Sequence, residues 1–316
     1  MLLSRVAENV YWMGRYLERA ENVARLINST TTALLDLPRG VQLGWDRLVR
    51  IIGGEKLAAE CLDSLDERSV MRFLISEVRH PNSNISCVKY ARENGRTTRE
   101  IISQEVWEQV NALYLFASDQ AAASLGRRKR FDFLNAIIVH CQTINGALAG
   151  TSIHDSAYQF LRIGRNLERA DMTSRIIDVP ALGLLTDPDD AGANPAYAAV
   201  RWMSVLKSLS AYQTYRYRVQ VNVRGPAVLG YLLHEGVFPR SVVHCLAAIG
   251  NCLAELPNPE TPQRSLGRLQ RFVHDADIDK LAEAGLHEFV DELQKGLEAL
   301  HSAVSEGYFR LNQAVA

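Results

Sequence analysis

The chain has 316 residues, of which 47% are apolar and 22% charged, a composition typical of a globular protein with room for about two domains. Its formal net charge of −1 excludes the overall field that attracts nucleic acid or an anionic membrane, and its five scattered cysteines do not indicate a zinc site or a disulfide framework. It contains no run of about 18 apolar residues and no signal-peptide pattern at its start, so we expect a soluble, cytoplasmic protein that does not span a membrane.

Apolar residues recur at three- and four-residue spacing along almost the whole chain, and strand-like alternation is almost absent. These patterns predict an all-α fold. A segment rich in Asp, Gly and Pro, residues 184–195, predicts a loop. The predicted helical segments, several of which we expect to contain more than one helix, are residues 4–36, 56–79, 84–118, 131–149, 155–178, 197–222, 240–255, 264–274 and 279–312.

Three segments of the first half recur in the second half in the same order. GRYLERAENVARLI at 14–27 matches GRNLERADMTSRII at 164–177 at eight of fourteen positions, and a second pair matches FLISEVRHPNSNISC at 73–87 with YLLHEGVFPRSVVHC at 231–245. A short motif that begins at Trp45 matches one that begins at Trp202. We therefore predict a tandem duplication of a helical-bundle unit, residues 1–149 and 150–316, with the copies packed about a pseudo-two-fold axis.

The repeated helix carries a charged stripe opposite its apolar face. Helical spacing places Arg15 within reach of Glu18, and Glu18 within reach of Asn22. In the second copy the stripe also carries large apolar residues, which indicates a face half-buried against another helix rather than a solvated one. The candidate site residues on this stripe are Arg15, Glu18 and Arg25 in the first copy and Arg165, Glu168 and Arg175 in the second.

This stripe has two interpretations. It is either a structural lattice of buried ion pairs or the lining of a polar pocket between the repeats, where arginine forks would suit a zwitterion, a carboxylate or a phosphate. In the pocket interpretation Glu18 and Glu168 could act as acid/base groups held by Arg15 and Arg165. Burial discriminates between them, because glutamates reachable by solvent favour binding or catalysis, whereas a dry, internally satisfied lattice favours a scaffold.

The stretch ARENGRTTREIISQEVWEQVN at 91–111 has no good counterpart in the second half. It is either a charged, exposed helix or an element that closes the polar site or forms a partner surface. On the second interpretation Arg96 and Arg99 are candidate binding residues, and Glu105 could pair with either of them.

Other chemistries find little support in the sequence. Glu77-x-x-His80 is half of a di-iron motif, but the other copy has Phe238 in place of the histidine, so we expect no metal site. Glycine patterns of nucleotide-binding loops are absent, so we expect no bound cofactor, and ATP would have to be held by a partner. The only basic cluster, residues 126–130, is too short to indicate nucleic-acid binding.

The chain carries an ER dipeptide in each repeated helix, within SRVAENVYWMGRYLERAENVARLI and FLRIGRNLERADMTSRI. With these segments and with ENGRTTREIISQEVWEQVN and FPRSVVHC, it resembles the Alpha-E family over nearly its whole length. The resemblance implies an association with circularly permuted ATP-grasp amide ligases, transglutaminase-like proteins and Ntn-hydrolase peptidases, and it carries no assigned catalytic residue. We therefore expect an accessory or binding subunit, without catalytic activity of its own, in an ATP-dependent peptide synthesis or modification system. The alternative is a helical enzyme that acts on a peptide or amino-acid derivative, and a third hypothesis, a helical adaptor, would require a large exposed apolar patch.

Overall fold

A computed structural model describes residues 4–35, 42–178, 185–186, 195–219 and 222–310. In the first half the elements are α1 (Ser4–Leu35), β1 (Gln42–Leu43), α2 (Trp45–Ile52), α3 (Glu55–Cys61), α4 (Glu67–Ser76), α5 (Asn84–Thr97), α6 (Gln104–Gln120), the 3-10 turn η1 (Ala122–Ser124) and α7 (Arg127–Thr151). In the second half they are α8 (Ser156–Ile177), β2 (Leu185–Thr186), α9 (Pro195–Ser208), α10 (Tyr212–Val219), α11 (Gly225–His234), α12 (Val242–Ala254), α13 (Glu260–His274), α14 (Ile278–Glu283) and α15 (Leu286–Tyr308).

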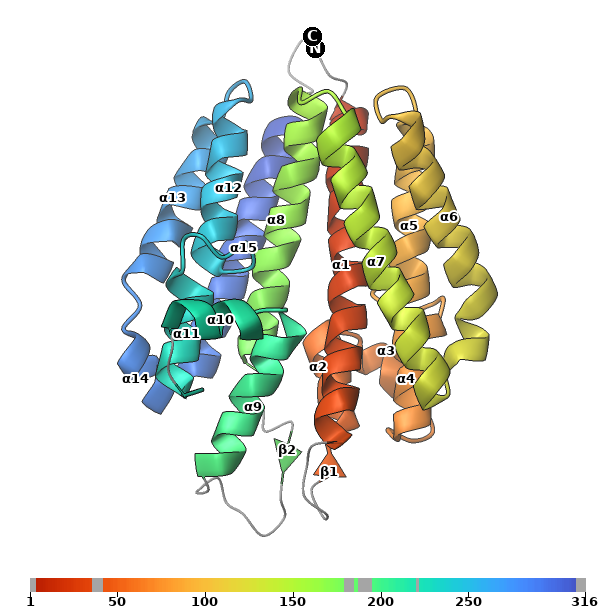
Figure 1. Cartoon of the computed structure of the whole chain (residues 1–316). Helices are drawn as coiled ribbons and strands as arrows, with labels where there is room; N and C mark the ends of the chain where they lie inside the picture. The colour runs from red at the N-terminus through yellow and green to blue at the C-terminus, as the bar shows by residue number, and fades with distance from the viewer. Residues whose placement is uncertain (1–3, 36–41, 179–184, 187–194, 220–221, 311–316) are drawn as a thin grey trace.

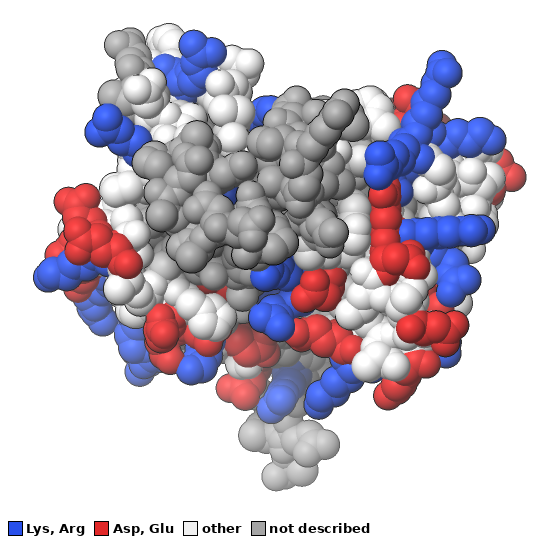
Figure 2. Space-filling model, turned by 90° about the horizontal axis from the view of Figure 1, so that it is seen from below, with Lys and Arg blue, Asp and Glu red and all other residues white. Residues whose placement is uncertain are grey.

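The all-α fold predicted from the sequence is confirmed. The two short strands form one antiparallel pair, in which Gln42 lies opposite Thr186 and Leu43 opposite Leu185. Among the described residues, no helix has the length and apolar composition needed to cross a bilayer. Seen from below, acidic and basic side chains are interspersed over the lower end of the molecule, in keeping with the small net charge (Figure 2).

The longest element, α1, runs beside α8 through the centre of the molecule (Figure 1). On one side α1 packs against α5 and α7, with α6 outside them. On the other side α8 packs against α12 and α15, with α13 outside them. The two halves thus pack their helices in the same order around their central helices, as a duplication would require; the duplication and its domain boundary remain predictions from the sequence.

The backbones of α1 and α8 approach each other closely at two glycines that occupy matching positions of the repeat. A Cβ atom added to Gly14 would overlap the carbonyl oxygen of Leu161, and one added to Gly164 would overlap the carbonyl oxygen of Tyr11. Only glycine lets two helices meet at this distance. The close crossing brings the charged stripes that follow each glycine within reach of each other.

The second matched pair of segments forms the same capped turn twice. Ser83 begins α5 and Ser241 begins α12; each hydroxyl oxygen accepts a hydrogen bond from the backbone N–H three residues later and donates to the carbonyl oxygen six residues earlier. The thiols of Cys87 and Cys245 each lie 3.6 Å from the carbonyl oxygen six residues earlier. The matched residues therefore fix one local structure, in which an N-cap starts the helix.

The predicted helical segment 84–118 is broken into α5 and α6. The hydroxyl of Thr98 donates to the carbonyl oxygen of Asn94, and α5 ends there. The hydroxyl oxygen of Ser103 accepts from the backbone N–H of Val106 and starts α6. Serine and threonine compete with the helix for backbone hydrogen bonds in this way, which apolar periodicity does not reveal.

Two further boundaries differ in detail from the expected segments. Residues 56–79 contain α3 and α4, and α4 starts where Asp66 accepts a hydrogen bond from the backbone N–H of Ser69. The helix α7 ends at Thr151, so the predicted division of the chain after residue 149 falls in its last turn. Of the predicted loop 184–195, only β2 and the first residue of α9 belong to the described part of the chain; the rest lies outside it.

Candidate functional site: an exchanged arginine–glutamate lattice

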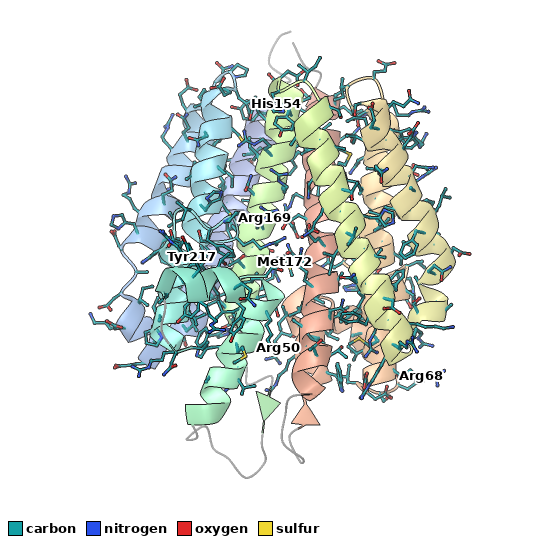
Figure 3. All side chains as sticks on the ribbon, in the orientation of Figure 1. Arg50, Arg68, His154, Arg169, Met172 and Tyr217 are labelled. Carbon is teal, nitrogen blue, oxygen red and sulfur yellow. The ribbon has the colours of Figure 1, made fainter. Side chains whose placement is uncertain are left out.

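The two ER dipeptides of the repeated helices exchange partners across the contact between α1 and α8. The guanidinium of Arg169 donates to both carboxylate oxygens of Glu18, from Nε at 2.9 Å and from a terminal nitrogen at 2.7 Å. In the opposite direction, Arg19 donates to both oxygens of Glu168, at 2.5 and 2.9 Å. These bidentate pairs are the strongest geometry that a guanidinium and a carboxylate can adopt. Figure 3 labels Arg169 and Met172 on α8, the helix that carries them.

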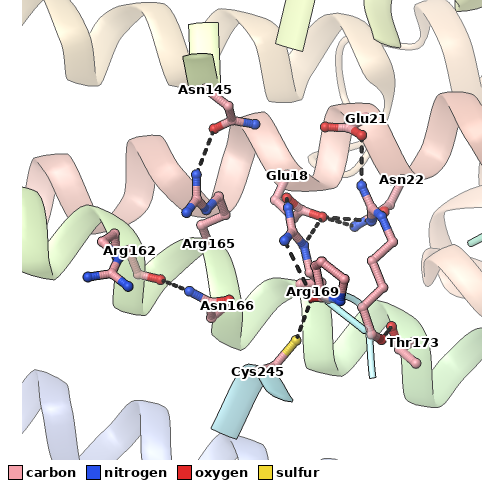
Figure 4. A network of polar contacts seen from close by, with 12 residues as sticks. Glu18, Glu21, Asn22, Asn145, Arg162, Arg165, Asn166, Arg169, Thr173 and Cys245 are labelled. Atoms are coloured by element: carbon pink, nitrogen blue, oxygen red, sulfur yellow. Dashed lines mark hydrogen bonds and ion pairs between the residues drawn. The ribbon is translucent and has the colours of Figure 1, made fainter. Parts of the chain in front are cut away.

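Each glutamate binds a second arginine, but the source of that arginine differs. Nε of Arg15 donates to Glu168 at 2.8 Å. Glu18 instead accepts at 2.9 Å from Arg240, which lies in the turn before α12. The same guanidinium also donates to Asn22 at 2.6 Å and to Glu21 at 2.7 Å. Figure 4 shows Glu18, Glu21 and Asn22 beside Arg169 in this part of the network.

Both central carboxylates are inaccessible and ionised. Glu18 is 0% and Glu168 1% exposed. Burial by itself raises the pKa of Glu168, but the nearby charges of Arg19 and Arg15 outweigh it and lower the pKa to about 2. In the same way, burial of Glu18 is outweighed by the charges of Arg169 and Arg240, which hold the pKa of Glu18 well below its usual range. Neither group can therefore carry a proton at neutral pH, which a general acid must do.

The lattice is asymmetric at Arg165, the counterpart of Arg15. Because Glu18 is occupied by Arg169 and Arg240, Arg165 forms no ion pair with a described carboxylate; it donates to Asn145 at 3.3 Å, and its Nε is buried without a partner (Figure 4). Burial and repulsion by Arg169 lower the pKa of Arg165. The sequence repeat predicts equal roles for the two arginines, and only the packing distinguishes them.

At the far end of the stripes, both copies form the same local pair. Arg25 donates to Glu21 at 2.9 Å and to the hydroxyl of Ser210 at 2.6 Å. Arg175 donates to Asp171 at 2.8 Å. The lattice as a whole therefore contains seven arginines and four carboxylates: Arg15, Arg19, Arg25, Arg165, Arg169, Arg175 and Arg240, with Glu18, Glu21, Glu168 and Asp171.

The expected pairings were only partly right. Glu18 accepts from Asn22 at 3.1 Å, as the helical spacing predicts. The expected contact between Arg15 and Glu18 is replaced by the contact of Arg15 with Glu168 on the other helix. A carboxylate on a closely packed neighbouring helix is reached as easily as one on the next turn, and Glu18 is already bound by Arg169 and Arg240.

The three candidates from the asymmetric stretch lie apart from the lattice. Arg96 donates to Glu93 at 2.9 Å, and the guanidinium carbon of Arg99 lies 5.0 Å from the ring centre of Trp107. Glu105 is exposed in the first turn of α6, and the described residues provide it with no ion pair, so the expected pairing with Arg96 or Arg99 does not form. Favourable placement of an acidic side chain at a helix N-terminus explains this glutamate without a partner.

Sequence reasoning named neither Arg19 nor Arg169 as a candidate site residue, and it missed Arg240, the arginine that completes the lattice. The signal available was the matched segment around Pro239, in which Arg240 corresponds to Asn82 of the first half. Both residues contact the ER dipeptide of α1: Arg240 donates to Glu18, and Asn82 accepts a hydrogen bond from Arg19 at 2.7 Å. Arg19 and Arg169 occupy matching positions in the two repeats. The sequence alone did not show that each of them binds the glutamate of the other central helix.

The di-iron half-motif has another explanation in the fold. The carboxylate of Glu77 accepts from Arg79 at 3.0 Å, and the buried ring of His80 stacks on Phe73 with ring centres 4.4 Å apart. Within the ranges that the structure describes, no three His, Cys, Asp or Glu side chains are grouped so as to hold a metal ion.

The fold and the lattice define a class of all-helical protein whose two central helices are joined by exchanged glutamate–arginine pairs. The chain belongs to the Alpha-E family, described as a predicted alpha-helical domain with a conserved ER motif, whose family model matches residues 2–309. In this chain the ER dipeptides of the central helices are the residues that form the buried bridge.

The chain is also similar to an uncharacterized protein of Mycobacterium bovis and to one of Mycobacterium tuberculosis, each 23% identical over 324 aligned residues. The alignments cover 93% of this chain but 35% of each relative, so the chain spans about a third of the length of the curated relatives it matches. No solved structure matches the chain.

Proposed function

We propose that this chain is an accessory or binding subunit of an ATP-dependent peptide synthesis or modification system, working beside an ATP-grasp-type amide ligase. The observation that carries the non-catalytic part of the proposal is the burial of Glu18 and Glu168, each saturated by two arginines. Any other packing of α1 against α8 would leave these buried charges without partners, so the lattice favours one arrangement of the two helices, as a scaffold requires.

The relatives support a role beside other protein domains. In each of them the region similar to this chain makes up 35% of a longer protein. In such a relative, about two thirds of the chain is other sequence, and a helical unit joined to it is suited to binding or positioning that part of the protein. The resemblance to Alpha-E proteins suggests an ATP-grasp-type ligase as the partner. It also suggests a transglutaminase-like protein or an Ntn-hydrolase peptidase as a further member of the system.

The enzyme alternative needs a reacting group that substrate can touch. A carboxylate that is at most 1% exposed and held ionised by two guanidiniums can neither donate a proton at neutral pH nor approach a substrate. The same burial that disfavours Glu18 and Glu168 as acid/base groups favours the accessory role.

The test is affinity purification of the tagged chain from its own cells, beside an unrelated helical protein with the same tag, followed by an assay of ATP-dependent amide-bond formation with and without the added chain. We expect an ATP-grasp-type ligase to be enriched by this chain alone, and its ligation rate to rise when the chain is added. Recovery of a transglutaminase-like protein or a peptidase without a ligase would contradict the proposed partner.

The enzyme alternative is tested with the purified chain by itself. We expect no turnover of peptides or amino-acid derivatives. Turnover that is abolished in Glu18→Gln, under conditions where far-UV circular dichroism shows the variant to be folded, would overturn the accessory role and restore the catalytic one.

A further inference from the structure

A second polar site, apart from the lattice, lies at the lower end of the molecule where α4 and α7 begin. A cavity of about 480 Å³ opens there, and its charged wall consists of Glu67, Arg68, Arg127 and Arg130. Its apolar wall is the turn between α6 and α7, which contains Ala122, Ala123 and Leu125. Figure 3 places Arg68 at this lower edge, on the side of α4 and α7.

Hydrogen bonds hold three members of the charged wall, Glu67, Arg127 and Arg130, against one another. Arg130 is only 2% exposed and donates to Glu67 at 2.6 Å and to the carbonyl oxygen of Leu125 at 3.3 Å. Arg127 donates to the same carboxylate from two nitrogens, at 2.7 and 3.1 Å. Glu67 thus orients two guanidiniums at once, and the hydrogen bonds from Arg127 and Arg130, helped by their charges, lower the pKa of its carboxyl group.

Positive charge is in excess at this cavity. Three arginines line the cavity beside a single carboxylate, and Arg68 is exposed, with a guanidinium that forms no hydrogen bond or ion pair with a described residue. The N-terminus of the 25-residue helix α7 adds to this excess, because Gly126 at its N-cap offers no side chain to its free N–H groups. The basic segment that begins at Arg127 is therefore arranged around a cavity rather than spread over a flat surface.

We propose that this cavity binds a phosphate monoester. The two uncompensated positive charges match the charge of a phosphate monoester dianion, and guanidinium groups with backbone N–H donors are the groups that bind phosphate oxygens in proteins. The volume exceeds that of a phosphate group, and the apolar wall accommodates a compact organic body beside it. This site is independent of the proposed ligase partnership.

The experiment measures binding of inorganic phosphate, phenyl phosphate and acetate to the whole chain by isothermal titration calorimetry at constant ionic strength. Three variants are compared with wild type. Arg68→Gln removes the unpaired guanidinium, and Gly126→Asp places a carboxylate at the helix N-cap, where an added Cβ meets no atom within 4 Å. Arg128→Gln is the matched control, because Arg128 is exposed on the same turn of α7 but does not line the cavity.

We expect saturable binding of phosphate, tighter binding of phenyl phosphate and no saturable binding of acetate. Arg68→Gln and Gly126→Asp should each weaken phosphate binding at least tenfold, whereas Arg128→Gln should change it less than threefold. Gly126→Asp separates loss of the site from loss of the fold, since aspartate is a favourable N-cap residue. Absence of saturable phosphate binding to wild type, or an equal loss in Arg128→Gln and Arg68→Gln, would overturn the proposal.

Discussion

Replacing Glu168 by Gln tests whether the exchanged pairs hold α1 against α8. The substitution keeps the size of the side chain but removes the charge shared by Arg15 and Arg19, whose side chains are 10% and 17% exposed. Removing one partner of a buried ion pair costs about 3–5 kcal/mol, because the other charge stays buried without compensation. The lowered pKa has the same sign: a carboxyl group whose pKa is lower in the folded than in the unfolded chain stabilises the fold at neutral pH.

The pH dependence makes this prediction specific. Because the folded pKa of Glu168 lies below its unfolded value of 4.5, its contribution is fully present above that value and is lost as pH falls through about 2. The difference in unfolding free energy between wild type and Glu168→Gln should therefore be about 3 kcal/mol at neutral pH and should shrink as the pH is lowered from about 5 to about 2.

The assay is urea unfolding followed by far-UV circular dichroism over this pH range, with Glu105→Gln as the control. Glu105 is exposed and forms no ion pair with the described residues, so its amide variant should lose only the helix N-terminus interaction and stay within about 1 kcal/mol of wild type. A neutral-pH difference below about 1 kcal/mol for Glu168→Gln, or a difference that does not change with pH, would refute the reasoning, since a buried, paired carboxylate requires both effects.

Three further outcomes follow from the geometry. Gly164→Ala should lower the unfolding free energy by about 3 kcal/mol, measured by urea unfolding, because its Cβ meets a backbone carbonyl that cannot move away. In the same assay Arg15→Gln should cost about 3 kcal/mol, whereas the matched variant Arg165→Gln should stay within about 1 kcal/mol of wild type, because Arg165 has no ion-pair partner among the described residues. The hydrogen bond and charge of Asp178 raise the pKa of His287, so an NMR titration should show a midpoint above 6.5 that falls in Asp178→Asn; this contribution to stability is present at acid pH and lost as pH rises through the folded pKa.

The predicted interaction partners show where helical periodicity is reliable. Spacing of three and four residues correctly placed the charged stripe on one face and correctly paired Glu18 with Asn22. It also predicted a contact between Arg15 and Glu18, but in the structure Arg15 donates to Glu168. Periodicity describes one helix at a time, and it carries no information about a carboxylate on a neighbouring helix.

The prediction for residues 91–111 shows a second limit. Arg96 and Arg99 were grouped with the lattice residues because they are charged and because the stretch occurs once in the chain. Their contacts are local, with Glu93 and with Trp107. A charge pattern without a known neighbour does not distinguish an exposed helix from the edge of a site.

The sequence by itself determined the all-α class and the position of the charged stripe on one face of each repeated helix, because these depend on residues close together in the chain. Only the tertiary structure decided that Glu18 binds Arg169 and Arg240 while Arg165 pairs with no carboxylate in the described part of the chain. Residues more than 150 positions apart meet there because Gly14 and Gly164 allow α1 and α8 to touch. The arginine that binds a buried carboxylate therefore depends on how closely the two helices approach and on which other arginines compete for the same carboxylate.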